Sequence, residues 1–160
     1  MTIQIGERIP EVVLQRIGDS GIEQIDTGNL FDGRRIVLFG VPGAFTPTCS
    51  EKHLPGYIEH FRSFQDQGVQ VACLSVNDPF VMQAWGKASG APSGLMMLAD
   101  GNAALTKALG VEMDASAFGM GQRCKRFALL ADDGVVQAIA VEDPGELRVS
   151  TAEAMLQHVA

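Results

Sequence analysis

The residues with the clearest chemical potential lie in a short loop that ends in a cysteine. Cys49 follows Thr46, which could cap a helix, and Pro47, which suits a first helical position because its missing N–H is not needed there. The sequence therefore predicts that Cys49 lies in the first turn of a helix. Unpaired backbone N–H groups and the helix dipole favour a thiolate at that place. Because a thiolate is a strong nucleophile, Cys49 is the candidate reactive residue.

The loop must be positioned by regular structure, and predicted strands and helices alternate along the chain. Residues 36–39 form an apolar, β-branched run that stops at Gly40, which predicts a buried strand over residues 34–39 leading into the loop. The other predicted strands span residues 12–14, 22–25, 69–76, 95–98, 127–131 and 135–141. Helices are predicted over residues 27–31, 54–67, 79–89, 100–109 and 150–159, and residues 111–121 are expected to be an irregular connection. This alternation predicts a mixed α/β sheet covered on both faces, with an N-terminal β-hairpin.

The loop and several later segments match one protein family in the same order. The pattern Pro42-x-x-x-Thr46-x-x-Cys49 resembles the active-site motif of the peroxiredoxins, and its surroundings resemble the peroxiredoxin 5 or type II subgroup. Further segments that carry the resemblance are residues 69–82, Trp85, residues 98–100 and residues 123–127. The resemblance implies a single-domain, thioredoxin-like α/β fold over residues 1–160, in agreement with the predicted alternation of strands and helices.

The resemblance also implies a thiol-dependent peroxidase for hydrogen peroxide and small alkyl hydroperoxides. In that reaction Cys49 attacks one peroxide oxygen and becomes a sulfenic acid, and Pro42 shields the sulfur. The Thr46 hydroxyl, the Cys49 backbone N–H and Arg126 bind the two peroxide oxygens. A guanidinium suits this role because it stays charged and donates several hydrogen bonds as negative charge moves onto the leaving oxygen. No cofactor is implied.

Each of these residues also has a simpler explanation. An isolated arginine such as Arg126 is most often a solvated surface charge, and Pro42 could be an ordinary turn proline. Thr46 could serve only as a helix cap, although capping and peroxide binding can coexist because they use different parts of the hydroxyl. Arg123 shares the family-like context of Arg126, and we expect it to support the site by pairing with an acidic residue.

A histidine and two further cysteines lie within reach of the same chemistry. His53 follows Cys49 by four residues, so both are expected on one helix face, either as a metal pair or, as we favour, with the histidine lining the thiol pocket. Cys73 lies in the middle of a predicted strand and is expected in the core. Cys124 precedes Arg126 by two residues, and an extended chain there would place its thiol near the site.

Recycling of the sulfenic acid must depend on an outside thiol. The two-cysteine members of the peroxiredoxin 5 group have a second, resolving cysteine near the C-terminus, and the matching residues 145–152 contain none. We therefore expect a one-cysteine enzyme that uses glutathione with glutaredoxin, or thioredoxin, as reductant. Phe45, Phe80 and Phe118 suit the homodimer that is typical of the subgroup, or else the core.

Composition narrows the class of protein and its partners. The chain of 160 residues has 46% hydrophobic and 19% charged residues, which is typical of one globular domain. A formal net charge of −7 argues against nucleic acid and anionic membranes as partners. The N-terminus lacks the basic and apolar regions of a secretory signal, and the three cysteines are widely spaced. These features predict a cytoplasmic protein.

Three functions are compatible with the residues. The first is the one-cysteine peroxidase, the second is a redox sensor that uses the same thiol to signal to a partner, and the third is a metal-binding protein that uses Cys49 and His53. The peroxidase hypothesis requires that Cys49 is not sealed in the core and that Arg126 points at its sulfur.

Overall fold

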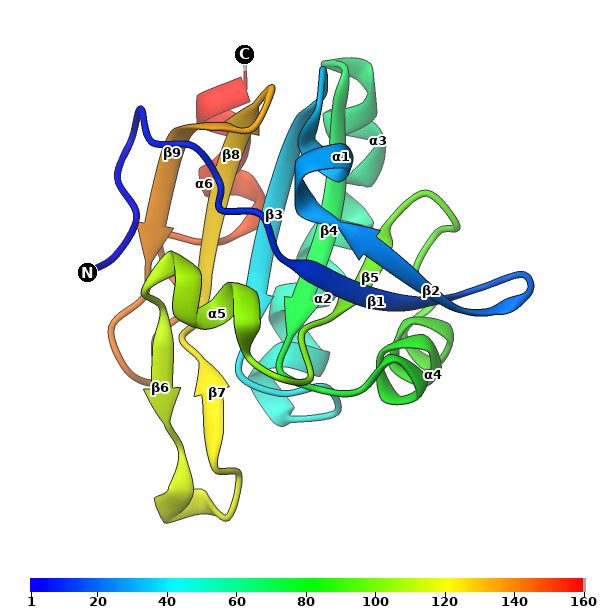
Figure 1. Ribbon diagram of the computed structural model, residues 1–160, viewed down its shortest axis with the longest axis vertical. Coiled ribbons are helices and arrows are strands. Elements are labelled where there is room, and N and C mark those ends of the chain that lie inside the picture. Colours follow the sequence, from blue (N-terminus) through cyan, green and yellow to red (C-terminus); the bar gives the residue numbers. More distant parts are fainter. Residues whose placement is uncertain (160) are drawn as a thin grey trace.

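A seven-stranded mixed sheet forms the centre of the computed structural model, which describes residues 1–159 (Figure 1). The strand order is β2-β1-β5-β4-β3-β8-β9, in which β3, β4 and β5 are parallel and the other neighbours are antiparallel. The strands are β1 (Val13–Gly18), β2 (Gly21–Asp26), β3 (Arg35–Val41), β4 (Val69–Ser75), β5 (Met96–Ala99), β8 (Phe127–Asp132) and β9 (Val135–Val141).

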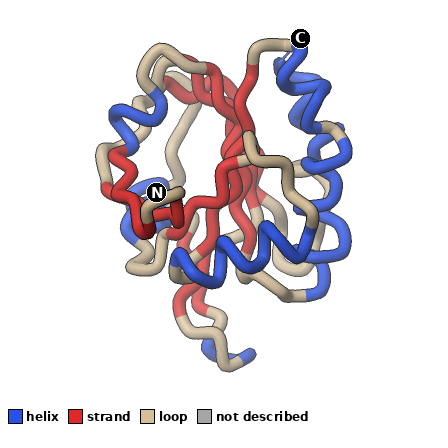
Figure 2. The backbone as a smooth tube through the Cα atoms, turned by 90° about the vertical axis from the view of Figure 1, so that its right-hand side faces the viewer, coloured by secondary structure: helices blue, strands red, loops and turns tan. Residues whose placement is uncertain are grey.

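Helices cover both faces of this sheet (Figure 2). Residues of α2 (Leu54–Glu59), α3 (Phe61–Asp66), α4 (Pro79–Ser89) and α6 (Ala152–Val159) pack into one core, and residues of α1 (Thr27–Phe31) and α5 (Ala104–Leu109) pack into the other. Alternation along β3 feeds both cores, because Val37 and Phe39 face the first and Ile36 and Leu38 the second. None of the described helices combines the length and the apolar character needed to cross a membrane.

The predicted single-domain, thioredoxin-like α/β fold is confirmed, including the N-terminal β1–β2 hairpin. Local sequence features also predicted two helix ends that the structure confirms. The Asp78 side chain accepts a hydrogen bond from the Val81 N–H and caps α4, as its place before Pro79 predicts. Gly110 ends α5 in the left-handed conformation, with φ 71°, where glycine carries no steric penalty.

Two predicted helices differ from the structure. The helix expected over residues 54–67 is broken at His60, whose backbone (φ −96°, ψ 8°) leaves the helical region and separates α2 from α3. The helix expected from residue 100 begins only at Ala104. Asp100 stays outside it, and its carboxylate accepts the N–H groups of Leu105 and Thr106. Periodicity did not reveal the break at His60, because the apolar spacing continues through it. Residues 100–102 carry no apolar side chain, and Asp100 instead binds the first turn of α5 from outside the helix.

The connection expected to be irregular over residues 111–121 contains regular structure. Strand β6 (Glu112–Asp114) pairs with β7 (Gln122–Cys124), and a 3-10 turn (Ser116–Phe118) lies between them. Gly119 and Gly121 take positive φ values of 70° and 64°, which lets the chain reverse within a few residues. This small hairpin extends away from the main sheet (Figure 1) and ends two residues before Arg126.

Candidate active site

Cys49 lies at the start of the helical segment that follows β3. The chain is helical from Pro47, and Cys49 opens η1 (Cys49–His53), a π-helical turn in which the Leu54 N–H donates to the Cys49 carbonyl. The prediction of a first-turn position is confirmed, but the turn is a π-helix and not an α-helix. Such turns are rare and occur often at functional sites. The preceding loop is also unusual, because Phe45 has a left-handed φ of 64°.

Arg126 reaches the Cys49 sulfur from the segment between β7 and β8, 77 residues further along the chain. Its Nη2 donates to Sγ at 3.2 Å, and its Nη1 donates to Nδ1 of His53 at 3.0 Å. Since one guanidinium contacts both side chains, Cys49 and His53 point to the same side, as their spacing predicts. A positive charge this close to the sulfur stabilises the thiolate form.

His53 is a neutral ring with one defined proton position. An arginine can only donate, so Nδ1 must accept from Arg126 and the proton must lie on Nε2, which donates to the Ser150 carbonyl at 3.0 Å. Burial and the Arg126 charge lower the pKa of His53 from 6.5 to about 3, although the hydrogen bond to Ser150 acts in the opposite direction. Both ring nitrogens are thus in use, which disfavours the metal pair considered for Cys49 and His53.

Thr46 and Pro42 shape the loop in front of the thiol. The Thr46 hydroxyl donates to the Gly43 carbonyl at 2.7 Å. Among the described residues no N–H donates to it, so the expected cap is not formed and its oxygen lone pairs remain available. The expectation that Arg123 pairs with an acidic residue is wrong. Its guanidinium donates to the backbone carbonyls of Val76 and Met120, at 3.1 and 2.9 Å, and more weakly to Pro42 at 3.5 Å.

A cavity of about 720 Å³ opens beside these residues. Pro42, Thr46 and Arg126 line it, together with apolar side chains of Met113, Phe118 and Met120. Cys49 itself has no exposed surface and packs in the core, so the requirement that the thiol is not sealed is not met in this structure, whereas Arg126 points at the sulfur as required and is partly exposed. The sulfur is therefore shielded from water, but its hydrogen-bond partner faces a cavity far larger than a peroxide molecule.

The other two cysteines are buried thiols on different faces of the sheet. Cys73 packs in the core that also contains Cys49, in the middle of β4 as expected. Cys124 lies in the opposite core and donates to the Val41 carbonyl at 3.1 Å, instead of pointing into the site beside Arg126. Burial raises the pKa of both thiols well above the ordinary value. Both thiols therefore stay protonated and are poor nucleophiles.

The sequence analysis did not identify the residues that support Cys49 and His53 through hydrogen bonds. The Trp85 indole donates to the Ser50 hydroxyl at 2.9 Å and so fixes the residue after Cys49. Glu142 and Ser150 anchor the loop that holds His53. A tryptophan that occurs once in the chain was a visible signal, but no local pattern pointed to Glu142 or Ser150.

Comparison with known proteins identifies the family of the chain. Residues 4–156 match the profile of the family described as Redoxin. The chain belongs to the redoxin family, among its peroxiredoxins. It is 48% identical over 162 residues to "Peroxiredoxin-2E-2, chloroplastic" of Oryza sativa, covering 98% of this chain and 72% of that one. Reduced Prx3 of Vibrio vulnificus in complex with H2O2 superposes with a TM-score of 0.95 at 46% identity, covering 99% of this peroxiredoxin and 100% of that chain.

The prediction of a cytoplasmic location is contradicted by these relatives. Besides the rice protein, "Peroxiredoxin-2E, chloroplastic" of Arabidopsis thaliana is 42% identical, covering 98% of this chain and 69% of that one. Both names assign those two relatives to chloroplasts. The composition and the wide spacing of the cysteines therefore did not determine the compartment.

Proposed function

We propose that this peroxiredoxin reduces hydrogen peroxide and small alkyl hydroperoxides through Cys49. Peroxiredoxins are thiol-dependent peroxidases, so the class of reaction follows from the family. The observation that carries the residue assignment is the 3.2 Å contact between Arg126 Nη2 and the Cys49 sulfur. The related Vibrio vulnificus structure, obtained in complex with H2O2, supports the same substrate class.

The reaction begins when peroxide enters from the cavity that Pro42, Thr46 and Arg126 line. The Cys49 thiolate attacks one oxygen, the O–O bond breaks as the S–O bond forms, and the leaving oxygen takes a proton and departs as water or an alcohol. Arg126 and the Cys49 backbone N–H stabilise the charge on the leaving oxygen. The Thr46 hydroxyl accepts the peroxide O–H, because its own proton is donated to Gly43.

The sulfenic acid on Cys49 is then reduced by an external thiol. Cys73 and Cys124 are fully buried and protonated, which makes them poor partners for it. A low-molecular thiol or a small thiol protein must therefore attack the oxidised sulfur, release water and be oxidised in turn. We assign this role to glutathione with glutaredoxin, or to thioredoxin.

Peroxide consumption by the purified protein tests this assignment. With glutathione plus glutaredoxin in one series and thioredoxin in the other, we expect multiple turnovers in at least one series, and none for Cys49→Ser. Cys124→Ala serves as the control, because its thiol faces the opposite core. Full activity of Cys49→Ser would overturn the proposal. A single oxidation followed by arrest with both reductants would favour the redox sensor.

The same proposal includes a homodimer. Phe45, Phe80 and Phe118 are 56%, 62% and 82% exposed, so these rings are available for contact with a second copy. Phe118 also lines the cavity beside Arg126, so a second copy covering it would narrow the entrance. Sedimentation velocity should show a dimer that dissociates in Phe80→Ser, and a monomeric wild-type protein would contradict this part.

A further inference from the structure

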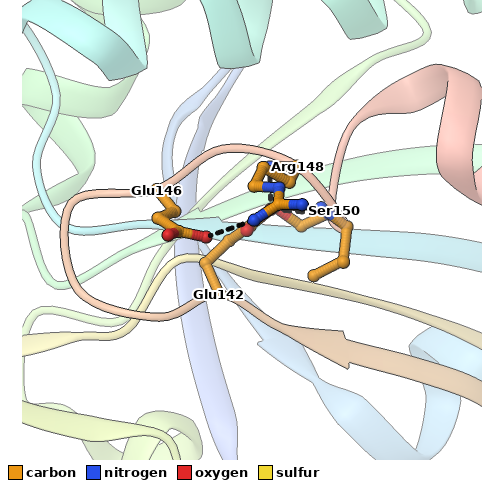
Figure 3. A network of polar contacts seen from close by, with 5 residues as sticks. Glu142, Glu146, Arg148 and Ser150 are labelled. Carbon is orange, nitrogen blue, oxygen red and sulfur yellow. Dashed lines mark hydrogen bonds and ion pairs between the residues drawn. The ribbon is translucent and has the colours of Figure 1, made fainter.

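Glu142, directly after β9, carries a buried carboxylate that lies outside the proposed reacting groups and accepts four hydrogen bonds. Its Oε2 accepts the backbone N–H groups of Arg148, Val149 and Ser150 at 2.8, 2.8 and 2.7 Å, and the Ser150 hydroxyl at 2.7 Å (Figure 3). Glu142 is only 6% exposed. One oxygen with four donors thus folds the loop from Glu142 to Ser150 back onto itself.

This loop presents the Ser150 carbonyl to two buried side chains. The carbonyl accepts the Nε2–H of His53 at 3.0 Å and the Tyr57 hydroxyl at 2.8 Å. Because Ser150 is held by both its N–H and its hydroxyl, its carbonyl has little freedom to turn away. The direction of that carbonyl decides which His53 nitrogen carries the proton, and hence whether Nδ1 can accept from Arg126.

A direct role of Glu142 in proton transfer fits the structure less well. Burial acts to raise the pKa of Glu142, but the hydrogen bonds from Ser150, Arg148 and Val149 outweigh it, so the pKa lies below its ordinary value. The carboxylate is therefore ionised near neutral pH and has no proton to donate. Its Oε2 is already saturated with donors, which leaves it little capacity to accept another.

We propose that Glu142 is a positioning residue that aims Arg126 at Cys49 through Ser150 and His53. Glu142 also donates its own backbone N–H to the Arg126 carbonyl at 2.9 Å. It therefore contacts both Ser150 and Arg126, the two ends of the chain of hydrogen bonds that we call the relay. The inference rests on the proposed function, since it concerns how the same site is kept in order. The proposal gives a function to the loop from Glu142 to Ser150, which makes none of the proposed contacts with peroxide.

The thiolate absorbance of Cys49, followed during a pH titration, tests the relay without any turnover. In Glu142→Ala we expect the midpoint of this titration to move to higher pH, and the rate constant for peroxide attack to fall by about tenfold to a hundredfold. Glu112→Ala is the matched control, because Glu112 is an exposed glutamate on β6 that is not among the residues lining the cavity. That control should titrate and react like the wild-type protein.

A double-mutant cycle separates a relay from general loosening of the structure. If Glu142 acts through His53, the titration shift in the double variant Glu142→Ala, His53→Ala should equal that of His53→Ala alone. Additive shifts would overturn the proposal, as would a wild-type midpoint in Glu142→Ala. Should Glu142→Ala not fold, Glu142→Gln gives the same comparison with a smaller shift, because an amide oxygen is a weaker acceptor. Full peroxidase activity of Cys49→Ser would instead overturn the proposed function.

Discussion

Two contacts of one guanidinium define the site at the scale of single residues. Arg126 donates to the Cys49 sulfur and to His53 with its two terminal nitrogens, so its plane is fixed as well as its charge. A lysine ammonium carries the same charge on a flexible stem but cannot reproduce this planar pair of donors. The planar geometry of the Arg126 guanidinium therefore matters in addition to its charge.

Substitution of Arg126 separates charge from geometry. We expect Arg126→Ala to reduce the second-order rate constant for peroxide by about a hundredfold to a thousandfold, which is typical of losing one charge-stabilising donor. Arg126→Lys should lie between Arg126→Ala and the wild-type protein. Stopped-flow fluorescence can follow the reaction, because Trp85 is the one tryptophan and contacts Ser50 beside the thiol. Arg62→Ala, an exposed change on α3, should have no effect.

At the scale of elements, the end of β3 determines how the loop and Arg126 meet. Gly40 on β3 pairs with Phe127 on β8, the residue directly after Arg126. The Phe127 ring is fully buried and lies over Gly40, in the space that a side chain there would occupy. The missing side chain thus allows β3 and β8 to approach just where the thiol loop begins.

A methyl group on Gly40 should disturb both stability and the site. Its Cβ would overlap the Phe127 ring, so we expect Gly40→Ala to lower the free energy of unfolding by about 1–3 kcal/mol, as overpacking does. Gly56→Ala in α2 is the control, because nothing lies within 4 Å of that Cβ. Removing a helical glycine should raise stability by about 0.5–1 kcal/mol. Denaturant unfolding measures both, and equal stability of the two variants would refute this packing argument.

For the whole molecule, the buried neutral state of His53 couples folding to pH. Its pKa is about 3 in the folded chain against an ordinary 6.5, so the unfolded chain binds a proton that the folded chain excludes. The free energy of unfolding must therefore fall as the pH decreases from 6.5 toward 3. The contribution of this neutral histidine is complete above that window.

Unfolding in urea between about pH 7 and about pH 5, above the range in which most carboxylates titrate, measures this coupling. We expect His53 to contribute a slope that approaches about 1.4 kcal/mol per pH unit at the acidic end. His53→Gln keeps a donor and an acceptor but cannot titrate, so its stability should change less over the same range. Identical slopes in the two proteins would show that His53 does not carry the effect.

Local features of the sequence determined much of the fold and the reactive residue. The apolar run before Gly40, the Pro47 that starts the helix, and the Asp78 cap each depend on neighbours a few residues away, and such short-range preferences can be read directly. The break at His60 was not predicted because the apolar period continues through it, and the later start of α5 was not predicted because Asp100 caps that helix from outside.

The family resemblance pointed to Arg126 beside Cys49, but only the tertiary structure decided the contacts that Arg126 and His53 make there. Arg126 lies 77 residues from Cys49, and Ser150 lies 97 residues from His53, so strand order and loop packing set these distances and no spacing rule could. The proton position on His53 and the four donors on Glu142 follow from that packing. The sequence alone identified the sulfur that can react, and the folded chain decided which charges and carbonyls meet it, because only folding brings distant side chains within hydrogen-bond distance.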